Sequence, residues 1–167
     1  VFENVRVPKE NLLGETGKGF RIAMSSLDVG RLGIGAQALG IAQGAFDQTA
    51  DYLKTRRQFG KALCEFQGLQ FEMAEMKNRI DAARLLLYQA ADRRDKGLPC
   101  TVPAAQAKLF CSETAMYVTT KAVQFHGGYG YTMDYPVERM MRDAKITEIY
   151  EGTSEIMKII ISSDIFK

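Results

Sequence analysis

The chain has 167 residues, of which 46% are hydrophobic and 25% charged, a composition typical of an ordinary globular domain with one sizeable core. Its 22 basic and 20 acidic residues leave a net charge of +2, which gives no electrostatic basis for binding nucleic acid. With a single histidine and three widely spaced cysteines, the sequence lacks a metal-ligand pattern and fits a reducing compartment with free, mostly buried thiols.

No segment predicts a signal peptide or a membrane span. The longest uncharged stretch runs from Leu32 to Phe46, which is too short to cross a bilayer. The first residue is Val1 rather than methionine. We therefore expect a soluble piece of a longer protein.

The first segment, Val1 to Pro8, alternates apolar and polar residues and ends at a proline, which predicts a short strand. A lone strand is not stable without a partner. We therefore expect residues 1–14 to be the trailing strand and linker of an upstream β domain, and residues 15–167 to form a helical domain.

A long helix is predicted from about Gly19 to Arg57. It contains several glycines, each of which weakens a helix by roughly 1 kcal/mol relative to alanine. Tertiary packing must hold such a helix, and its small residues would let a neighbouring helix approach closely. The glycines are Gly30, Gly33, Gly35, Gly40 and Gly44.

Two further helices carry apolar or small residues at strict 3-4 spacing, the pattern of helices packed nearly parallel to one another. Shorter helices are expected from Pro136 to about Lys145 and after Gly152. Short loops between helices favour an antiparallel, up-down arrangement. We predict an all-α fold of the four-helix-bundle type, with an additional short helix and the short N-terminal strand. The spaced positions are Phe66, Leu69, Met73, Met76, Ile80, Ala83, Leu87 and Ala90, then Ala105, Leu109, Ser112, Met116, Thr119 and Val123.

The candidate for chemistry is Glu151, a carboxylate beside a glycine hinge and directly before a helix start. Gly152 is expected as the N-cap and Glu155 at the third helical position, where an acid favours the free N–H groups. Glu151 then lies outside the first turn and can point into a cleft. The local pattern alone favours the alternative, a plain helix-start acid.

Two segments could bind phosphate. Arg56 and Arg57 lie at a helix end beside Phe59, and arginine forks suit diphosphates while an exposed ring can stack on a purine. The alternative is that these basic residues complement the negative helix end. Gln124 to Gly130 offers three glycines, whose backbone a ligand could approach closely, or it could be only a turn. Asp28 and Arg31 are spaced for an ion pair on one helix face, or could line a channel mouth.

Taken together and in this order, nine segments resemble the C-terminal helical domain of the acyl-CoA dehydrogenases, and the resemblance covers essentially the whole chain. They are Phe2–Pro8, Leu13–Glu15, Gly17–Phe20, Asp28–Arg31, Arg56–Gly60, Phe66–Gln67, Gln124–Gly130, Met141–Ile146 and Ile149–Ile156.

The resemblance implies a FAD enzyme that removes two hydrogens from the α and β carbons of an acyl-CoA. Glu151 would take the α-proton while the β-hydrogen leaves as hydride to FAD, with the thioester carbonyl polarised by a flavin hydroxyl and the backbone N–H of the base. Some relatives carry the base on the long helix, at the place matching Gly30. A glycine there is typical of the short- to medium-chain type, nearest the butyryl-CoA group.

The same resemblance assigns the remaining site residues. Arg56, Phe59 and Gln67, with the loop Gln124, Phe125, His126, Gly127 and Gly128, match contacts to FAD, in part the FAD of a neighbouring subunit. Thr153, Ser154 and Glu155 match contacts to the chain's own FAD, and Asp28, Val29, Gly30, Arg31, Tyr150 and Gly152 match the substrate side.

The expected partners are the acyl-CoA substrate, electron-transferring flavoprotein as electron acceptor, and further copies of the chain in a dimer of dimers. The location would be the bacterial cytoplasm or the mitochondrial matrix. Since the family's N-terminal helical and middle β domains are missing here, we expect the piece alone to be inactive. The alternatives are an acyl-CoA oxidase and a non-catalytic helical oligomerisation module.

Overall fold

The computed structural model describes residues 1–167 and confirms the predicted all-α fold, with five helices and one small hairpin. The elements are α1 (Gly19–Thr55), β1 (Arg57–Gln58), β2 (Lys61–Ala62), α2 (Gln67–Asp95), α3 (Thr101–His126), α4 (Val137–Ile146) and α5 (Ser154–Ile165).

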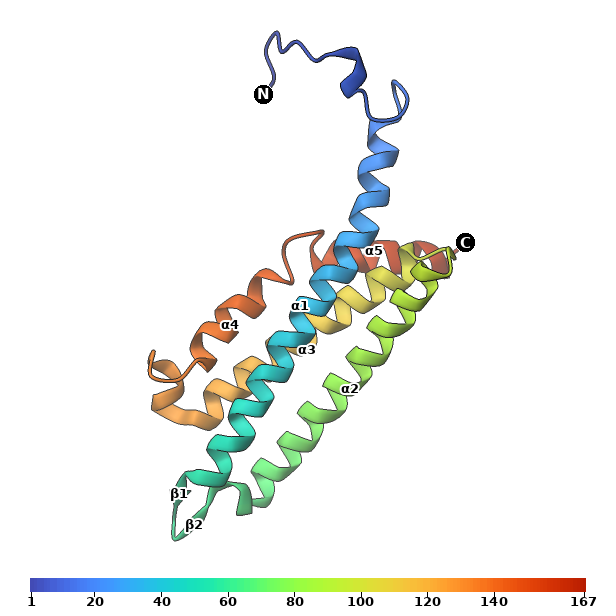
Figure 1. Cartoon of the computed structure of the whole chain (residues 1–167). Coiled ribbons are helices and arrows are strands. Elements are labelled where there is room, and N and C mark those ends of the chain that lie inside the picture. The colour runs from blue at the N-terminus through green and yellow to red at the C-terminus, as the bar shows by residue number, and fades with distance from the viewer.

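The first four helices alternate in direction, and α5 crosses the bundle at the end where α1 enters it (Figure 1). The hairpin of β1 and β2 closes the opposite end. The chain between α3 and α4 includes a 3₁₀ turn, Gly127–Tyr131, near that same end. The two ends of the bundle are therefore built by different segments.

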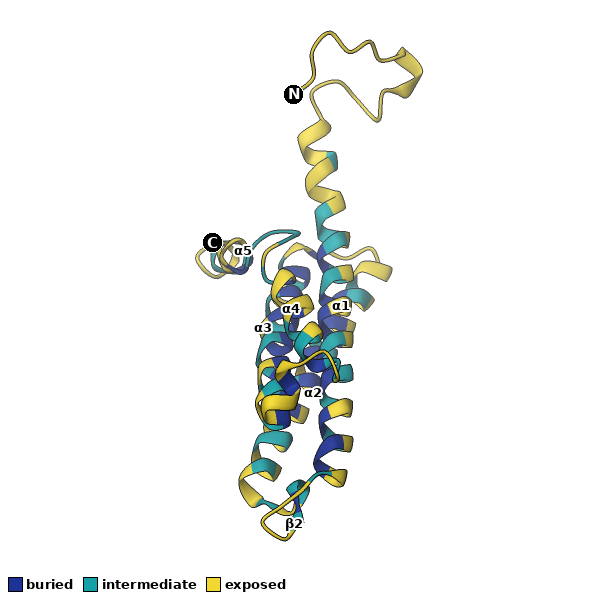
Figure 2. Cartoon of the chain, turned by 90° about the vertical axis from the view of Figure 1, so that its left-hand side faces the viewer, coloured by how far each residue is buried: buried dark blue, intermediate teal, exposed yellow.

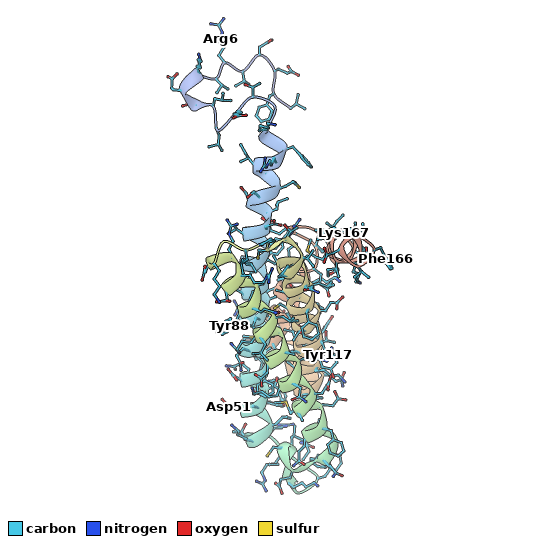
Figure 3. All side chains as sticks on the ribbon, turned by 90° about the vertical axis from the view of Figure 1, so that its right-hand side faces the viewer. Arg6, Asp51, Tyr88, Tyr117, Phe166 and Lys167 are labelled. Atoms are coloured by element: carbon cyan, nitrogen blue, oxygen red, sulfur yellow. The ribbon has the colours of Figure 1, made fainter.

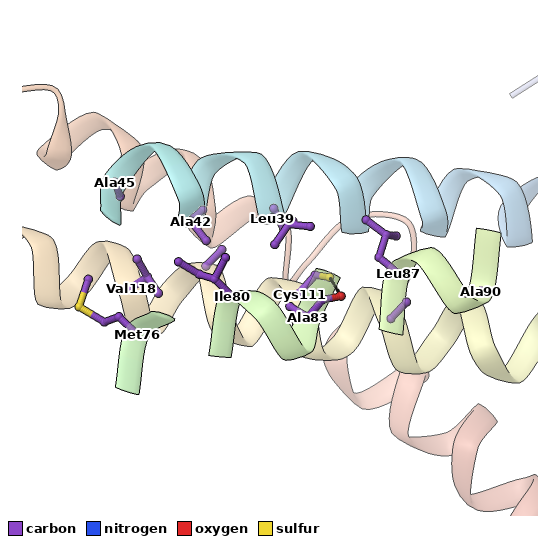
Figure 4. Close-up of a cluster of buried hydrophobic side chains, with 14 of the residues drawn as sticks. Leu39, Ala42, Ala45, Met76, Ile80, Ala83, Leu87, Ala90, Cys111 and Val118 are labelled. Carbon is purple, nitrogen blue, oxygen red and sulfur yellow. Dashed lines mark hydrogen bonds between the residues drawn. The ribbon is translucent and has the colours of Figure 1, made fainter. Parts of the chain in front are cut away.

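The core lies between α1, α2 and α3 (Figure 4). The predicted seam of α2 is confirmed, because Met76, Ile80, Ala83, Leu87 and Ala90 are its buried residues. Its first members are only half-buried, since they lie near the hairpin end, where fewer elements cover them.

α3 is more deeply buried than one seam predicts. Ala105, Ser112 and Thr119 from the predicted seam are buried, and a second stripe on α3 is buried as well. The reason is position, because α3 packs against all four other helices. The second stripe consists of Ala104, Lys108, Cys111, Ala115, Val118 and Ala122.

The predicted close approach of helices occurs at Gly35. A β-carbon there would lie 3.2 Å from Leu87 Cδ1 and 3.7 Å from Lys108 Cα, so α1 and α3 meet almost backbone to backbone. Gly33 and Gly40, by contrast, face open space.

α1 ends at Thr55, two residues before the predicted end, because Arg56 turns to an extended conformation (φ −72°, ψ 129°). The hairpin turn that follows has positive φ at both central residues, Phe59 (52°) and Gly60 (81°), as a type I′ turn requires. Phe59 is consequently presented at the tip, 91% exposed.

The N-terminal segment is unpaired, as expected for a strand whose partners would lie in an upstream domain. Val1 to Pro8 has no strand partner within the chain and runs as an exposed coil, and the first turns of α1 also project beyond the bundle (Figure 2). Arg6 lies in the coil that projects beyond the end of the bundle where α5 and its Phe166 terminus also lie (Figure 3).

Cys100 and Cys111 are buried and Cys64 is half-buried, and all three are free thiols, as predicted. None of the helices combines the length and the hydropathy that a bilayer crossing requires.

Candidate active site

Glu151 lies in the loop between α4 and α5 with a left-handed backbone (φ 54°), and Gly152 follows with φ 97°. A left-handed conformation costs a residue with a side chain about 1 kcal/mol or more. Across the loop the Ser154 amide donates to the Glu148 carbonyl at 3.0 Å. The backbone at Glu151 is therefore held by contacts with its surroundings rather than by its own preference.

The start of α5 differs from the prediction by one residue. The N-cap is Thr153, not Gly152, because an N-cap needs an extended backbone, which Thr153 has and the left-handed Gly152 does not. The Thr153 hydroxyl accepts a hydrogen bond from the Ile156 amide at 3.4 Å. Glu155 stays in the first turn, where its own backbone N–H and the Thr153 hydroxyl lower the pKa of its carboxyl.

The Glu151 carboxylate points at α1. Its Oε2 is buried and accepts no hydrogen bond from the chain. A β-carbon at Gly30 would lie 2.7 Å from Oε2 and 2.8 Å from Cδ of Glu151, distances that real atoms do not reach. The carboxylate can occupy this place only because residue 30 has no side chain.

Asp28 and Arg31 form the predicted ion pair beside Gly30, with Arg31 Nη1 2.8 Å from Asp28 Oδ1. The other Asp28 oxygen accepts from the Thr101 hydroxyl at 2.7 Å, which ties α1 to the first residue of α3. Val29 is 46% exposed and faces away from the bundle interior. Asp28 and Arg31 thus flank the position opposite the carboxylate and are anchored to the bundle.

At the hairpin end, a cavity of about 510 Å³ brings Arg56 together with Gln124, Phe125, His126, Gly127 and Gly128, which the resemblance assigns to contacts with FAD. Gly127 is left-handed (φ 63°), and a side chain at Gly127 or Gly128 would meet nothing within 4 Å, so the backbone there is open. The Arg56 guanidinium lies 5.3 Å from the Tyr129 ring centre. A guanidinium facing an open glycine backbone suits a diphosphate.

His126 is the last residue of α3, and it is buried. Its ring stacks on Tyr52 at 4.1 Å, and Nδ1 lies 2.7 Å from the Ala122 carbonyl oxygen, so this nitrogen carries a proton. Burial lowers the pKa of the imidazole. No three His, Cys, Asp or Glu side chains lie close enough together to hold a metal ion. The neutral His126 ring therefore lines the cavity.

Phe59 and Gln67 line a neighbouring groove of about 430 Å³, together with Lys61 and Phe66. Leu63 borders both this groove and the Arg56 cavity, so the two adjoin. The Phe59 ring stands edge-on to Phe66, with centroids 6.4 Å apart. The groove therefore has an aromatic wall next to the Arg56 cavity, the one suited to a diphosphate.

Thr153, Ser154 and Glu155 line a separate depression of about 280 Å³ at the start of α5. The Ser154 hydroxyl is buried and makes no hydrogen bond within the chain. The depression also includes Lys145, Glu148 and charged side chains of α3 and α5.

The predicted residues therefore form two groups at opposite ends of α3. Lys108, beside the Glu151 loop, and His126, beside the Arg56 cavity, are 18 residues apart on one helix, which spans about 27 Å. One bound ligand therefore cannot place a single diphosphate both at Arg56 and at Thr153.

Residues 17–166 match the family described as acyl-CoA dehydrogenase, C-terminal domain. The chain belongs to the acyl-CoA dehydrogenase family.

Two relatives illustrate the match of this acyl-CoA dehydrogenase domain. The short-chain-specific acyl-CoA dehydrogenase of Clostridium acetobutylicum is 62% identical over 167 residues, which is 100% of this chain and 44% of that protein. The butyryl-CoA dehydrogenase structure from Megasphaera elsdenii is 55% identical with a TM-score of 0.98, again over 100% of this chain and 44% of that one.

A chain in a structure described as the electron transferring flavoprotein of Acidaminococcus fermentans is 56% identical with a TM-score of 0.98, over 100% of this chain and 44% of that chain. The acyl-CoA dehydrogenase domain described here thus spans less than half the length of the relatives that it matches.

Two residues near Glu151 were missed by the sequence prediction. Lys108 is fully buried, and its Nζ donates to the Gly152 carbonyl at 2.8 Å. The Tyr150 hydroxyl lies 2.6 Å from Gln37 Oε1, which fixes the ring just before Glu151. A signal for Lys108 was present, because it falls within the second 3-4 stripe of α3 among small residues. Gln37 lies on an exposed helix face and gave no signal.

Proposed function

We propose that this chain is the C-terminal domain of a FAD-dependent acyl-CoA dehydrogenase that converts short- to medium-chain acyl-CoA thioesters into trans-2-enoyl-CoA. The missing parts would be an N-terminal helical domain and a middle β domain. Residues 1–14 would then be the trailing strand and linker of the middle domain. The relatives named short-chain specific and butyryl-CoA dehydrogenase support the chain-length range.

The observation that carries the proposal is the Glu151 carboxylate, whose Oε2 is buried, without a hydrogen-bond partner and packed against Gly30. A carboxylate that only ended a helix would be solvated or paired, since an unsatisfied buried oxygen costs free energy. A base must instead keep an oxygen free to accept a proton. Glu151 meets that requirement.

Glu151 would remove the α-proton of the thioester, and the C–H electron pair would form the α,β double bond as the β-hydrogen leaves with its own pair. The backbone N–H of Glu151 makes no hydrogen bond within the chain. It is free to donate to the thioester carbonyl, whose oxygen gains negative charge as the proton leaves. One residue would thus supply both the base and an oxyanion donor.

The residues at the hairpin end fit FAD. Arg56 and the open backbone of Gly127 and Gly128 would hold its diphosphate, and Phe59 with Gln67 would border the neighbouring groove. FAD, when bound, supplies the acceptor for the hydride that leaves the β-carbon. The adjoining cavity and groove support this assignment.

The two groups are separated along α3 by about 27 Å, the rise of the helix from Lys108 to His126. This separation supports a further part of the proposal, that the two groups serve different FAD molecules. Arg56 and the glycine loop would bind the FAD of a neighbouring subunit, while Thr153 to Glu155 would contact the chain's own. We propose a homo-oligomer, a dimer of dimers. The exposed Ile159, Ile165 and Phe166 of the α5 end would lie in its interfaces.

Electron-transferring flavoprotein is the proposed electron acceptor, in line with the description of the Acidaminococcus fermentans structure. The two expected locations were the bacterial cytoplasm and the mitochondrial matrix. Because the relatives named above come from bacteria, we propose the cytoplasm.

The test uses the full-length enzyme that carries this chain. Its flavin is titrated anaerobically with butyryl-CoA and followed by FAD absorbance, for wild type and Glu151→Gln. We expect rapid bleaching in wild type and a loss of about 10²–10⁴-fold in rate in the variant, the range for a general base, with FAD still bound. Equal bleaching in both would place the base elsewhere.

The same preparation separates the remaining alternatives. Rapid reoxidation of the reduced flavin by oxygen would identify an oxidase, whereas reoxidation only by electron-transferring flavoprotein supports the dehydrogenase. A full-length protein that binds neither FAD nor acyl-CoA would be a helical assembly module.

A further inference from the structure

Lys108 is a buried cation for which the proposed chemistry has no use. The residue is 0% exposed and forms no ion pair, and its one hydrogen bond runs from Nζ to the Gly152 carbonyl oxygen at 2.8 Å. Burial lowers the pKa of its ammonium, Glu148 and Glu151 act to raise it, and Arg31 acts to lower it. Burying an ammonium is costly, and an apolar residue of similar size would fill the same space without that cost.

The hydrogen bond acts where the backbone is least favourable. Gly152 directly follows the base, and these two residues form the left-handed pair of the loop, with φ 54° and 97°. Because the Gly152 carbonyl is anchored, its peptide plane is fixed, and this limits the rotation by which Glu151 could leave its unfavourable conformation.

The other contacts of the loop act on its flanks. The Ser154 amide reaches back to Glu148, the Thr153 hydroxyl caps α5, and the Tyr150 hydroxyl meets Gln37. None of these involves the backbone of Glu151 or the Gly152 carbonyl. Lys108 is the side chain that holds the residue next to the base.

The backbone from which the Lys108 side chain extends is itself fixed. Its Cα lies 3.7 Å from where a β-carbon of Gly35 would be, at the close approach of α1 and α3. The same helix α1 supplies Gly30, against which the carboxylate rests. The loop and the wall that it faces are therefore set relative to one another through α1 and α3.

We propose that Lys108 is a positioning residue for proton transfer: its ammonium holds the Gly152 carbonyl and thereby keeps the Glu151 carboxylate against Gly30, in place to take the α-proton. This rests on the proposed function of Glu151. The role is distinct from stabilising the bundle, because it acts through the loop conformation and not through the helical core.

The test compares Lys108→Met with Lys121→Met in the full-length enzyme. Lys121 is the matched control, since it lies on the same helix but pairs with Glu72, far from the loop. The rate of flavin bleaching by butyryl-CoA is measured in single turnover per bound FAD, over a range of substrate concentrations. We expect Lys108→Met to lower the limiting rate about 10²-fold, the effect of displacing a reacting group by about 1 Å, while half-saturation changes little. Lys121→Met should match wild type.

A double-variant cycle separates positioning from general damage. If Lys108 acts through Glu151, Lys108→Met should slow the Glu151→Gln enzyme no further, whereas a structural defect would slow both backgrounds by the same factor. Two outcomes would overturn the inference. One is a limiting rate in Lys108→Met equal to that in Lys121→Met, and the other is slowing by the same factor in the wild-type and Glu151→Gln backgrounds. An active Glu151→Gln enzyme would instead overturn the proposed function itself.

A readout independent of turnover is the crystal structure of full-length Lys108→Met. We expect Glu151 to leave the left-handed region and its carboxylate to move away from Gly30. An unchanged loop would contradict the positioning role.

Discussion

The two ends of α3 differ in how their polar groups are satisfied. At the Glu151 end, the structure keeps a strained backbone, a carboxylate oxygen without a partner and an ammonium bonded only to a carbonyl. At the His126 end, the imidazole is neutral, hydrogen-bonded and stacked on Tyr52, and the glycine backbone opens to a cavity.

This difference is the one expected between a site for reaction and a site for binding, the roles that we propose for the two ends. Groups that must change protonation cannot be fully satisfied beforehand, so their environment retains strain and unpaired atoms. Groups that only hold a ligand can be fixed by ordinary packing. Substitutions at the two ends should therefore affect different measurements.

The largest effect is expected from Gly30→Ala. The new methyl group would lie 2.7 Å from Glu151 Oε2, so the carboxylate must move, and activity should fall by about 10²-fold in single-turnover bleaching. Gly33→Ala, one turn along α1 and facing open space, is the control. It should keep full activity and stabilise the protein by about 0.5–1 kcal/mol through helix propensity. Full activity in Gly30→Ala would show that the carboxylate does not work from this position.

A smaller and different effect is expected from Arg56→Met. Loss of a charged donor to a diphosphate should weaken FAD binding by about tenfold or more, measured as the FAD dissociation constant of the full-length enzyme. The neighbouring Arg57→Met removes an equal charge from an exposed position outside the cavity and should leave FAD binding nearly unchanged. Equal losses in the two variants would mean that general charge, rather than the cavity, attracts the cofactor.

The smallest effect concerns His126 and acid. Its pKa is lowered in the folded protein, so below about pH 6.5 the unfolded chain binds a proton first, and stability falls as the pH falls. The slope from this one group is at most about 1.4 kcal/mol per pH unit, and above pH 6.5 it vanishes. Urea unfolding at pH 7.5 and 5.5 should show this loss in wild type.

In His126→Asn the side-chain amide can still donate to the Ala122 carbonyl but cannot titrate, so the loss from this group should disappear. An identical pH dependence in both proteins would rule out His126 as its source.

Much of this arrangement could be predicted from the sequence, because it depends on local rules. The 3-4 spacing of α2 predicted its buried face correctly. The order of motifs, through the family resemblance, singled out Glu151, Gly30 and the glycine loop, and the roles of these residues stay predictions. The N-cap prediction missed by one residue because the left-handed conformation of Gly152 depends on tertiary contacts. The strand at Val1 to Pro8 stays a prediction, because it was expected to pair with strands of an upstream β domain and this chain offers it no partner.

Lys108 was missed for another reason. Spacing along a helix shows which residues share a face, but not that α3 is central and buries a second face. The separation of the two site groups likewise depends on which helix joins them, and this becomes visible only in the assembled bundle.

The close fit between Gly30 and Glu151 also limits where the carboxylate can be attached. The space beside α1 holds one acidic group, which the chain can supply from the loop at position 151 or from the helix at position 30, but never from both. Exchanging the two residue types, Gly30→Glu with Glu151→Gly, would change the direction from which the acid enters that space rather than the space itself. Two positions 121 residues apart in sequence therefore limit each other's side chains, because they share one space.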